Sequence, residues 1–172
     1  MLIRREAPGD VVAVHEVTAA AFGPGPDGAP PKEAGLVDEL RRCDAWMPAL
    51  SLVAIGPQGD VVGHVLCTRG RVEAVPVLGL GPLSVRPDHQ GRGVGKALVH
   101  TALGAADALD EPLVALLGSP GYYTRFGFRP AVEVGIEAPD PSWGEAFQVR
   151  TLSGHRPAIR GAFHYPAPFD GL

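Results

Sequence analysis

The sequence has few cysteines and no regularly spaced metal ligands. Cys43 and Cys67 are the only cysteines, and neither belongs to a CxxC or similar pattern. Two lone thiols are typical of a protein from a reducing compartment. The histidines also show no ligand spacing, so the sequence predicts no metal site.

Long apolar runs and clustered positive charge are absent as well. No apolar stretch approaches the length that crosses a bilayer, and residues 1–6 contain charge with no signal-peptide segment after them. The net charge is −4 and the 15 basic residues are scattered, whereas a nucleic-acid groove needs a dense cationic face. We therefore expect a soluble, cytoplasmic protein that binds neither nucleic acid nor membrane.

The length and apolar content fit one domain. The chain has 172 residues, of which 45% are hydrophobic. This is enough to build a core without a disulfide or a metal. We expect a single domain that spans residues 1–172.

Apolar periodicity divides the chain into strands and helices. Spacings of three and four predict helices over 10–21, 32–43 and 93–109, with a brief one over 120–126. Apolar or alternating runs predict strands over 2–5, 50–55, 61–72, 75–85 and 113–117, and short strands around 132–136 and 147–152. Pro82 predicts a bulge or kink, and the glycines and prolines of 23–31 predict a loop.

The order of these elements indicates an α/β (α+β) fold with a mixed, mostly antiparallel sheet. The long helix over 93–109 connects two apolar strands, 75–85 and 113–117. A strand–helix–strand connection of this kind places its two strands parallel. The hairpin strands before it are expected to be antiparallel.

A glycine-rich loop precedes the long helix and carries the clearest chemical signal. The segment reads Gln90, Gly91, Arg92, Gly93, Val94, Gly95, Lys96. Alternating glycines let the backbone approach a ligand, and the first turn of a helix leaves N–H groups without partners. With the positive end of the helix dipole, these donors form an anion site, to which Arg92 and Lys96 add charge.

Other phosphate-binding motifs do not fit this loop. A Walker loop would need glycine at Gln90 and a hydroxyl residue at Ala97. A dinucleotide fingerprint would need glycine at Lys96 or at Leu98. The pattern that fits is Gln-x-x-Gly-x-Gly.

This pattern resembles the central motif of the GNAT superfamily of N-acetyltransferases. In that superfamily it follows a strand and Val-x-Pro, here Val85 to Pro87, and a closing Tyr-x-x-x-Gly-Phe is matched by Tyr123, Gly127 and Phe128. Gly63-His64, Gly81-Pro82-Leu83 and the tail 161–166 look like the YhbS-like branch. The resemblance implies the GNAT acyl-CoA N-acyltransferase fold, with a core over 1–130, a less typical tail over 131–172 and a splayed central parallel pair.

The resemblance also implies roles for individual residues. Residues 90–96 would bind the pyrophosphate of acetyl-CoA, and Leu83, Ser84 and Val85 would bind its pantetheine arm. Tyr123 would give a proton to the departing thiolate, with Tyr122 one residue out of register. Phe126 would line the cofactor, and Ser119 stands where many relatives carry an asparagine, a residue that this chain lacks.

The implied activity is transfer of an acetyl group from acetyl-CoA directly to an amine, without a covalent enzyme intermediate. Candidate bases are Glu33, His64 and Glu73. Each also has a structural interpretation: Glu33 opens the second helix, His64 is a strand histidine bonded to backbone, and Glu73 lies in a solvated turn. A non-catalytic acyl-CoA sensor and an acyltransferase with a longer acyl-CoA or a non-amine acceptor stay open. A homodimer is the family-level expectation.

Overall fold

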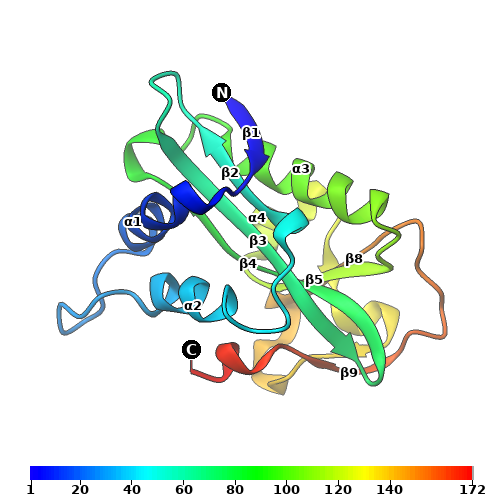
Figure 1. Ribbon diagram of the computed structural model, residues 1–172. Helices are drawn as coiled ribbons and strands as arrows, with labels where there is room; N and C mark the ends of the chain where they lie inside the picture. Colours follow the sequence, from blue (N-terminus) through cyan, green and yellow to red (C-terminus); the bar gives the residue numbers. More distant parts are fainter. Residues whose placement is uncertain (172) are drawn as a thin grey trace.

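The protein is a mixed sheet with helices on both faces (Figure 1). The computed structural model describes residues 1–171. The helices are α1 Val11–Phe22, α2 Lys32–Leu40, α3 Val94–Ala108 and α4 Pro120–Tyr123. The strands are β1 Leu2–Arg5, β2 Ser51–Ile55, β3 Val61–Val72, β4 Val75–Val85, β5 Leu113–Leu117, β6 Arg129–Pro130, β7 Ile136–Glu137, β8 Phe147–Thr151 and β9 Gly161–His164. None of the helices in this part of the chain is both long and apolar enough to cross a bilayer.

The strand order confirms the predicted sheet. It runs β1-β2-β3-β4-β5-β8-β6, and β9 adds to the free edge of β3 and pairs with β7. The pair β4–β5 is parallel, as α3 connects them, and the other pairs on the main path are antiparallel. Strand β5 lies between β4 and β8, which explains why its sequence is an unbroken apolar run.

The predicted boundaries hold best where periodicity is long. Strands β3 and β4 match their predicted ranges, whereas α2 ends at Leu40, before the predicted end at 43. The predicted strand around 132–136 is wrong. Residues Ala131–Val134 form a 3-10 helix that ends at Gly135, whose φ of 75° is left-handed, and only Ile136–Glu137 pairs as a strand.

Each face of the sheet has its own core. On one face α3 packs its buried stripe, including Leu98 and Ala102, against β2–β5. On the other face α1 and α2 pack against β2 and β3. The C-terminal segment crosses this second face to reach α2, where Lys32 Nζ donates to the carbonyl of Gly171 at 3.1 Å (Figure 1).

The two parallel strands diverge after a short contact. Strands β4 and β5 pair only at Leu78↔Val114 and Gly79↔Ala115. Beyond Gly79, β4 continues its pairing with β3 as far as Val85, but no residue of β5 stands beside it. The ladder with β3 shifts register around Gly81-Pro82, which confirms the predicted irregularity at Pro82. On its β5 side, β4 thus has no strand partner from 80 to 85, and this unpaired stretch is called the gap in the sheet.

Candidate acyl-CoA site

The head of α3 presents a run of unpaired backbone donors. Gly91 and Gly93 have φ values of 72° and 82°, the left-handed region in which a side chain is disfavoured. Within residues 1–171, the N–H groups of residues 91–96 form no hydrogen bond to protein atoms; the first bond of the helix is from Ala97 N to Gly93 O. These donors and the helix dipole make a site for a phosphate-like anion.

Side chains before the helix brace this loop. Gln90 Nε2 donates to the carbonyl of Val85 at 3.0 Å, so the Gln90 side chain holds the loop against the end of β4. Arg86 Nη1 contacts Asp60 at 2.6 Å and Arg86 Nε contacts Asp88 at 2.7 Å. The hydrogen bond from Arg86 lowers the pKa of Asp88, so the Asp88 carboxylate is ionised at neutral pH.

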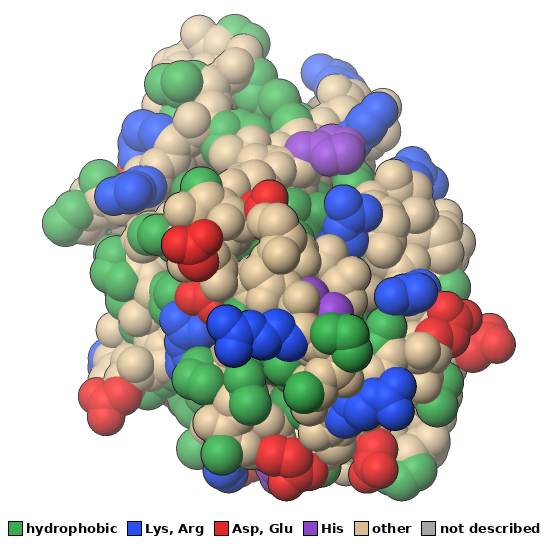
Figure 2. All heavy atoms as spheres, turned by 90° about the vertical axis from the view of Figure 1, so that its right-hand side faces the viewer, with side chains coloured by type: hydrophobic (Ala, Val, Ile, Leu, Met, Phe, Trp, Pro, Cys, Tyr) green, Lys and Arg blue, Asp and Glu red, His purple; other side chains and the backbone are tan. Residues whose placement is uncertain are grey.

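Of the remaining loop side chains, two are exposed to solvent and one is buried in the core. Arg92 and Lys96 are exposed and, within the described chain, form no ion pair. Val94 is buried, and its side chain packs beside Gly63 of β3. Val94 can therefore contact a ligand through its backbone N–H, while Arg92 and Lys96 can add mobile charge. Figure 2 shows that elsewhere, on the face drawn there, basic and acidic side chains are interspersed.

The two tyrosines of α4 lie at different depths below the surface. The Tyr122 hydroxyl oxygen lies over the first turn of α3, 2.8 Å from the point where a β-carbon on Gly95 would stand. Tyr123 lies deeper, against Gly118 at the end of β5. Its ring contacts Phe128 with centroids 5.8 Å apart. Tyr122 is therefore beside the first turn of α3, and Tyr123 is beside the end of β5.

Burial raises the pKa of the Tyr123 phenol. Desolvation, with a smaller contribution from Tyr122, raises the pKa of Tyr123 to about 12. Desolvation also raises the pKa of Tyr122. A phenol that holds its proton at neutral pH is a hydrogen-bond donor and a proton source for a basic leaving group.

Other predicted site residues lie at the edges of this region. Leu83 and Val85 are half-buried along the gap, while Ser84 is buried and bonds Thr18 of α1. Ser119 is exposed at the start of α4. Phe126 is 3% exposed and lies in the core beside α3. The centroids of its ring and of the His100 ring are 5.1 Å apart. Contact of Ser119 and Phe126 with the cofactor stays a prediction.

The candidate bases differ in how they are held. Glu73 accepts a hydrogen bond from Ala162 N at 2.7 Å and so ties the β3–β4 turn to β9. Glu33 is half-buried in the first turn of α2, and its carboxylate forms no hydrogen bond within the described residues. His64 is 0% exposed, and its partners are side chains, in contrast to the predicted backbone bond.

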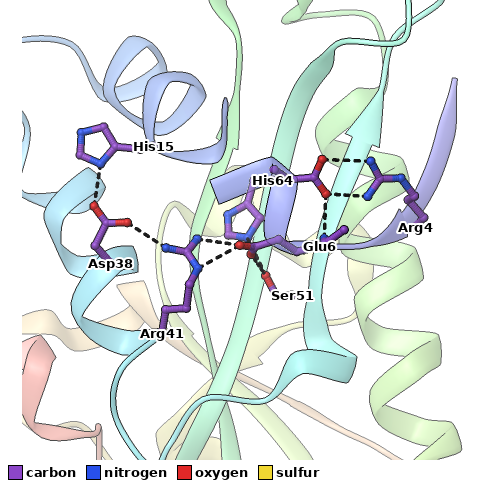
Figure 3. A network of polar contacts seen from close by, with 9 residues as sticks. Arg4, Glu6, His15, Asp38, Arg41, Ser51 and His64 are labelled. Atoms are coloured by element: carbon purple, nitrogen blue, oxygen red, sulfur yellow. Dashed lines mark hydrogen bonds and ion pairs between the residues drawn. The ribbon is translucent and has the colours of Figure 1, made fainter. Parts of the chain in front are cut away.

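Sequence reasoning missed the polar network to which His64 belongs (Figure 3). Ser51 of β2 donates to Glu6, and Ser51 Oγ lies 2.9 Å from His64 Nε2. Arg41, at the end of α2, contacts Glu6 at 2.8 Å and Asp38 at 2.8 Å. These residues come from separate elements and form no local motif, so no sequence spacing could reveal them.

Comparisons with known proteins agree with this geometry. Residues 15–128 match the Acetyltransferase (GNAT) family. The Escherichia coli protein YjhQ, an uncharacterized N-acetyltransferase, is 38% identical over 161 residues, which cover 85% of each chain. YhbS, another uncharacterized N-acetyltransferase of Escherichia coli, is 32% identical over 155 residues, with 89% of this chain and 88% of YhbS covered.

Solved structures extend the match to the whole fold. YhbS in complex with CoA superposes with a TM-score of 0.85 at 28% identity, covering 98% of this chain and 91% of that one. A GNAT family acetyltransferase from Brucella melitensis in complex with acetyl-CoA gives 0.77 at 32% identity, covering 98% and 97%. The chain described here belongs to the GNAT acetyltransferase family.

Proposed function

We propose that this protein transfers an acetyl group from acetyl-CoA to the nitrogen of an amine acceptor. The observation that carries the proposal is the run of free N–H donors at 91–96 beside a gap in the sheet. The two similar structures that contain CoA and acetyl-CoA support the same ligand for this chain.

In the proposed complex the pyrophosphate lies on the amides of 91–96, and the pantetheine arm enters the gap beside Leu83 to Val85. Free backbone groups on that edge of β4 would pair with the amides of the arm, and an N–H there would polarise the thioester carbonyl. The amine attacks this carbonyl directly, because both substrates are held together. The carbon–sulfur bond breaks as the carbon–nitrogen bond forms.

Tyr123 is the proposed acid. Its ring lies against Gly118 at the end of β5, and its phenol keeps its proton at neutral pH. Transfer of that proton to the departing thiolate of CoA would remove the charge that develops on sulfur. Loss of one general acid typically costs on the order of 10²–10⁴-fold in rate.

A non-catalytic acyl-CoA sensor is the main alternative. It would need the donors at 91–96 but no acid, and the presence of Tyr123 at the motif position favours the enzyme. A longer acyl group or a non-amine acceptor is a second alternative, because the gap beside Leu83 sets which acyl group fits.

Thermal-shift and thiol-release assays test the proposal. Acetyl-CoA should raise the melting temperature, and thiol release should appear with members of an amine library. Tyr123→Phe should keep the thermal shift and lose about 100-fold in kcat. Binding of CoA without turnover for any amine would favour the sensor, and faster turnover with a longer acyl-CoA would favour the second alternative.

A further inference from the structure

One ring nitrogen of His64 has no partner in the polar network. The side chain is 0% exposed. Its Nε2 lies 2.9 Å from Ser51 Oγ and 3.4 Å from Glu6 Oε2, while Nδ1 has no hydrogen-bond partner among the described residues. Buried polar atoms in folded proteins nearly always have a partner in protein or water, so this atom calls for an explanation.

The hydrogen bonds define which nitrogen carries the proton. Ser51 has a single hydroxyl proton and donates it to Glu6, so toward His64 its oxygen can only accept. Nε2 of His64 must then be the donor, and Nδ1 holds the free lone pair. Burial lowers the pKa of His64 in spite of Glu6, which keeps the ring neutral at neutral pH. His64 is therefore a buried base with its lone pair available.

This base lies one strand from the gap. His64 of β3 is the cross-strand partner of Ser84 of β4, and Ser84 belongs to the stretch that β5 leaves unpaired. Neighbouring strands are about 4.8 Å apart. The Ser84 hydroxyl bonds Thr18 of α1 at 3.2 Å, so the two side chains are directed to the α1 face, opposite α3.

The charged groups around the ring come from three segments. Glu6, after β1, is 3.4 Å away, and Arg41 of α2 contacts Glu6. Asp38 lies behind Arg41, and His15 of α1 contacts Asp38 and not His64. From β4 and α1 the facing groups, Ser84 and Thr18, are uncharged. Among residues 1–171, Glu6 is thus the one carboxylate that can stabilise a charged His64.

We propose that His64 accepts, through a bound water, the proton that the acceptor ammonium must lose before it attacks. This inference rests on the proposed function. The ammonium gives one proton to the water, and the water gives one to His64 Nδ1. The free amine forms the carbon–nitrogen bond as the carbon–sulfur bond breaks, and Tyr123 gives its proton to the thiolate. The second proton of the attacking nitrogen restores Tyr123, and His64 releases its proton to solvent through the water. His64 acts through water and is a positioning residue.

Glu6 and Arg41 complete the relay. Burial works to raise the pKa of Glu6, but hydrogen bonds from His64 and Ser51 and the charge of Arg41 outweigh it, and the net pKa is lowered. Glu6 is therefore ionised and faces the Nε2–H of His64. Its charge stabilises the imidazolium while the proton is held.

Nitrogen NMR tests the geometry without turnover. In ¹⁵N-histidine-labelled protein, His64 should show a protonated Nε2 and an unprotonated Nδ1 at neutral pH. Ser51→Ala, which removes the acceptor, should shift the tautomer ratio. A protonated Nδ1 in the wild-type protein would overturn the relay.

Kinetics test the role. With benzylamine, which is mostly protonated at neutral pH, His64→Gln should lower kcat about 100-fold and leave the KM for acetyl-CoA unchanged. The rate should recover as pH rises and free amine accumulates. With aniline, which is mostly unprotonated, the loss should be under about threefold. His164→Gln, which alters an exposed histidine of β9 outside this network, is the matched control and should have no effect.

The outcomes separate this inference from the proposed function. An equal loss for both amines, or an unchanged rate for both, would overturn the relay and leave the acetyltransferase proposal standing. Loss of the pH-dependent rate in Glu33→Gln and not in His64→Gln would also overturn it, in favour of Glu33. No thiol release from wild-type protein with any amine would defeat the proposed function and the relay with it. If His64→Gln does not fold, Ser51→Ala serves for the same pair of amines and should move the pH profile.

Discussion

At the scale of single residues, the site depends on glycines that leave room for neighbouring groups. Gly95 is in the first turn of α3, and the Tyr122 hydroxyl occupies the space where its β-carbon would be. Gly104, in the same helix, has no atom within 4 Å of that point. A comparison of substitutions at Gly95 and Gly104 therefore separates the role of a glycine in the site from the general effect of a glycine on helix stability.

Alanine substitutions at these positions should have opposite effects. Gly95→Ala should displace Tyr122, cost about 1 kcal/mol of stability and weaken CoA binding several-fold, because overpacking moves both side chain and helix head. Gly104→Ala should raise the free energy of unfolding by about 0.5–1 kcal/mol and leave CoA binding unchanged. Urea unfolding and CoA titration measure both. Equal CoA affinity in the two variants would contradict the assigned role of Gly95.

Residue-scale prediction from sequence is possible where a signal is local. The loop 90–96 and Tyr123 are recognisable because their spacing along the chain reflects one turn or one short helix. The environment of His64 was not predictable. Glu6 and Ser51 are far from it in sequence, and only the pairing of β2 with β3 and the path after β1 bring them together.

At the scale of elements, ion pairs join the start of α1 and the end of α2 to β1 and the residue that follows it. Arg4 contacts Asp10 at 2.6 Å, and Arg41 contacts Glu6 at 2.8 Å. The hydrogen bond from Arg4 lowers the pKa of Asp10 against the opposing effect of burial. The pKa of Glu6 is also lowered from its ordinary value of 4.5.

These shifts predict loss of stability in acid. A carboxyl group with a lowered pKa in the folded state stabilises the fold above its unfolded pKa, and this contribution disappears as the pH falls through the folded pKa. The urea midpoint should therefore fall steadily below about pH 4.5. In Glu6→Gln the dependence should be shallower, and at pH 7 the variant should be about 2 kcal/mol less stable, because Arg41 keeps only Asp38 as an ion-pair partner and Ser51 and His64 lose a charged acceptor. A slope identical to that of the wild-type protein would refute this assignment.

Element prediction followed the length of the pattern. Strands β3 and β4 and helix α3 have long periodic sequences and were predicted closely. The tail was predicted poorly, because strands such as β7 have two residues and their partners are distant. Strand β9 was not predicted at all, since its place depends on the free edge of β3.

At the scale of the whole molecule, the tail belongs to the same sheet as the typical core. Strand β8 pairs with β5 from Leu113↔Thr151 to Leu117↔Phe147, and β9 pairs with β3. Phe147 of β8 and Phe163 of β9 are buried in the same hydrophobic cluster. We therefore propose that residues 1–172 form one cooperative domain.

Truncation tests this proposal. A chain ending at residue 130 would expose the β8 edge of β5 and one face of the sheet, so it should fail to fold or should aggregate. The full chain should unfold in one transition with coincident near- and far-UV circular dichroism. A stable, CoA-binding fragment 1–130 would show that the tail is a separate unit.

The central claim is that backbone donors at the head of α3 hold a diphosphate. The most direct measurement is a ¹H–¹⁵N NMR titration that compares CoA with pantetheine, which lacks the diphosphate. The structure predicts that CoA shifts the amide resonances of residues 91–96 strongly and that pantetheine leaves most of them in place. Unchanged resonances for these amides at saturating CoA, or equal shifts with pantetheine, would contradict it.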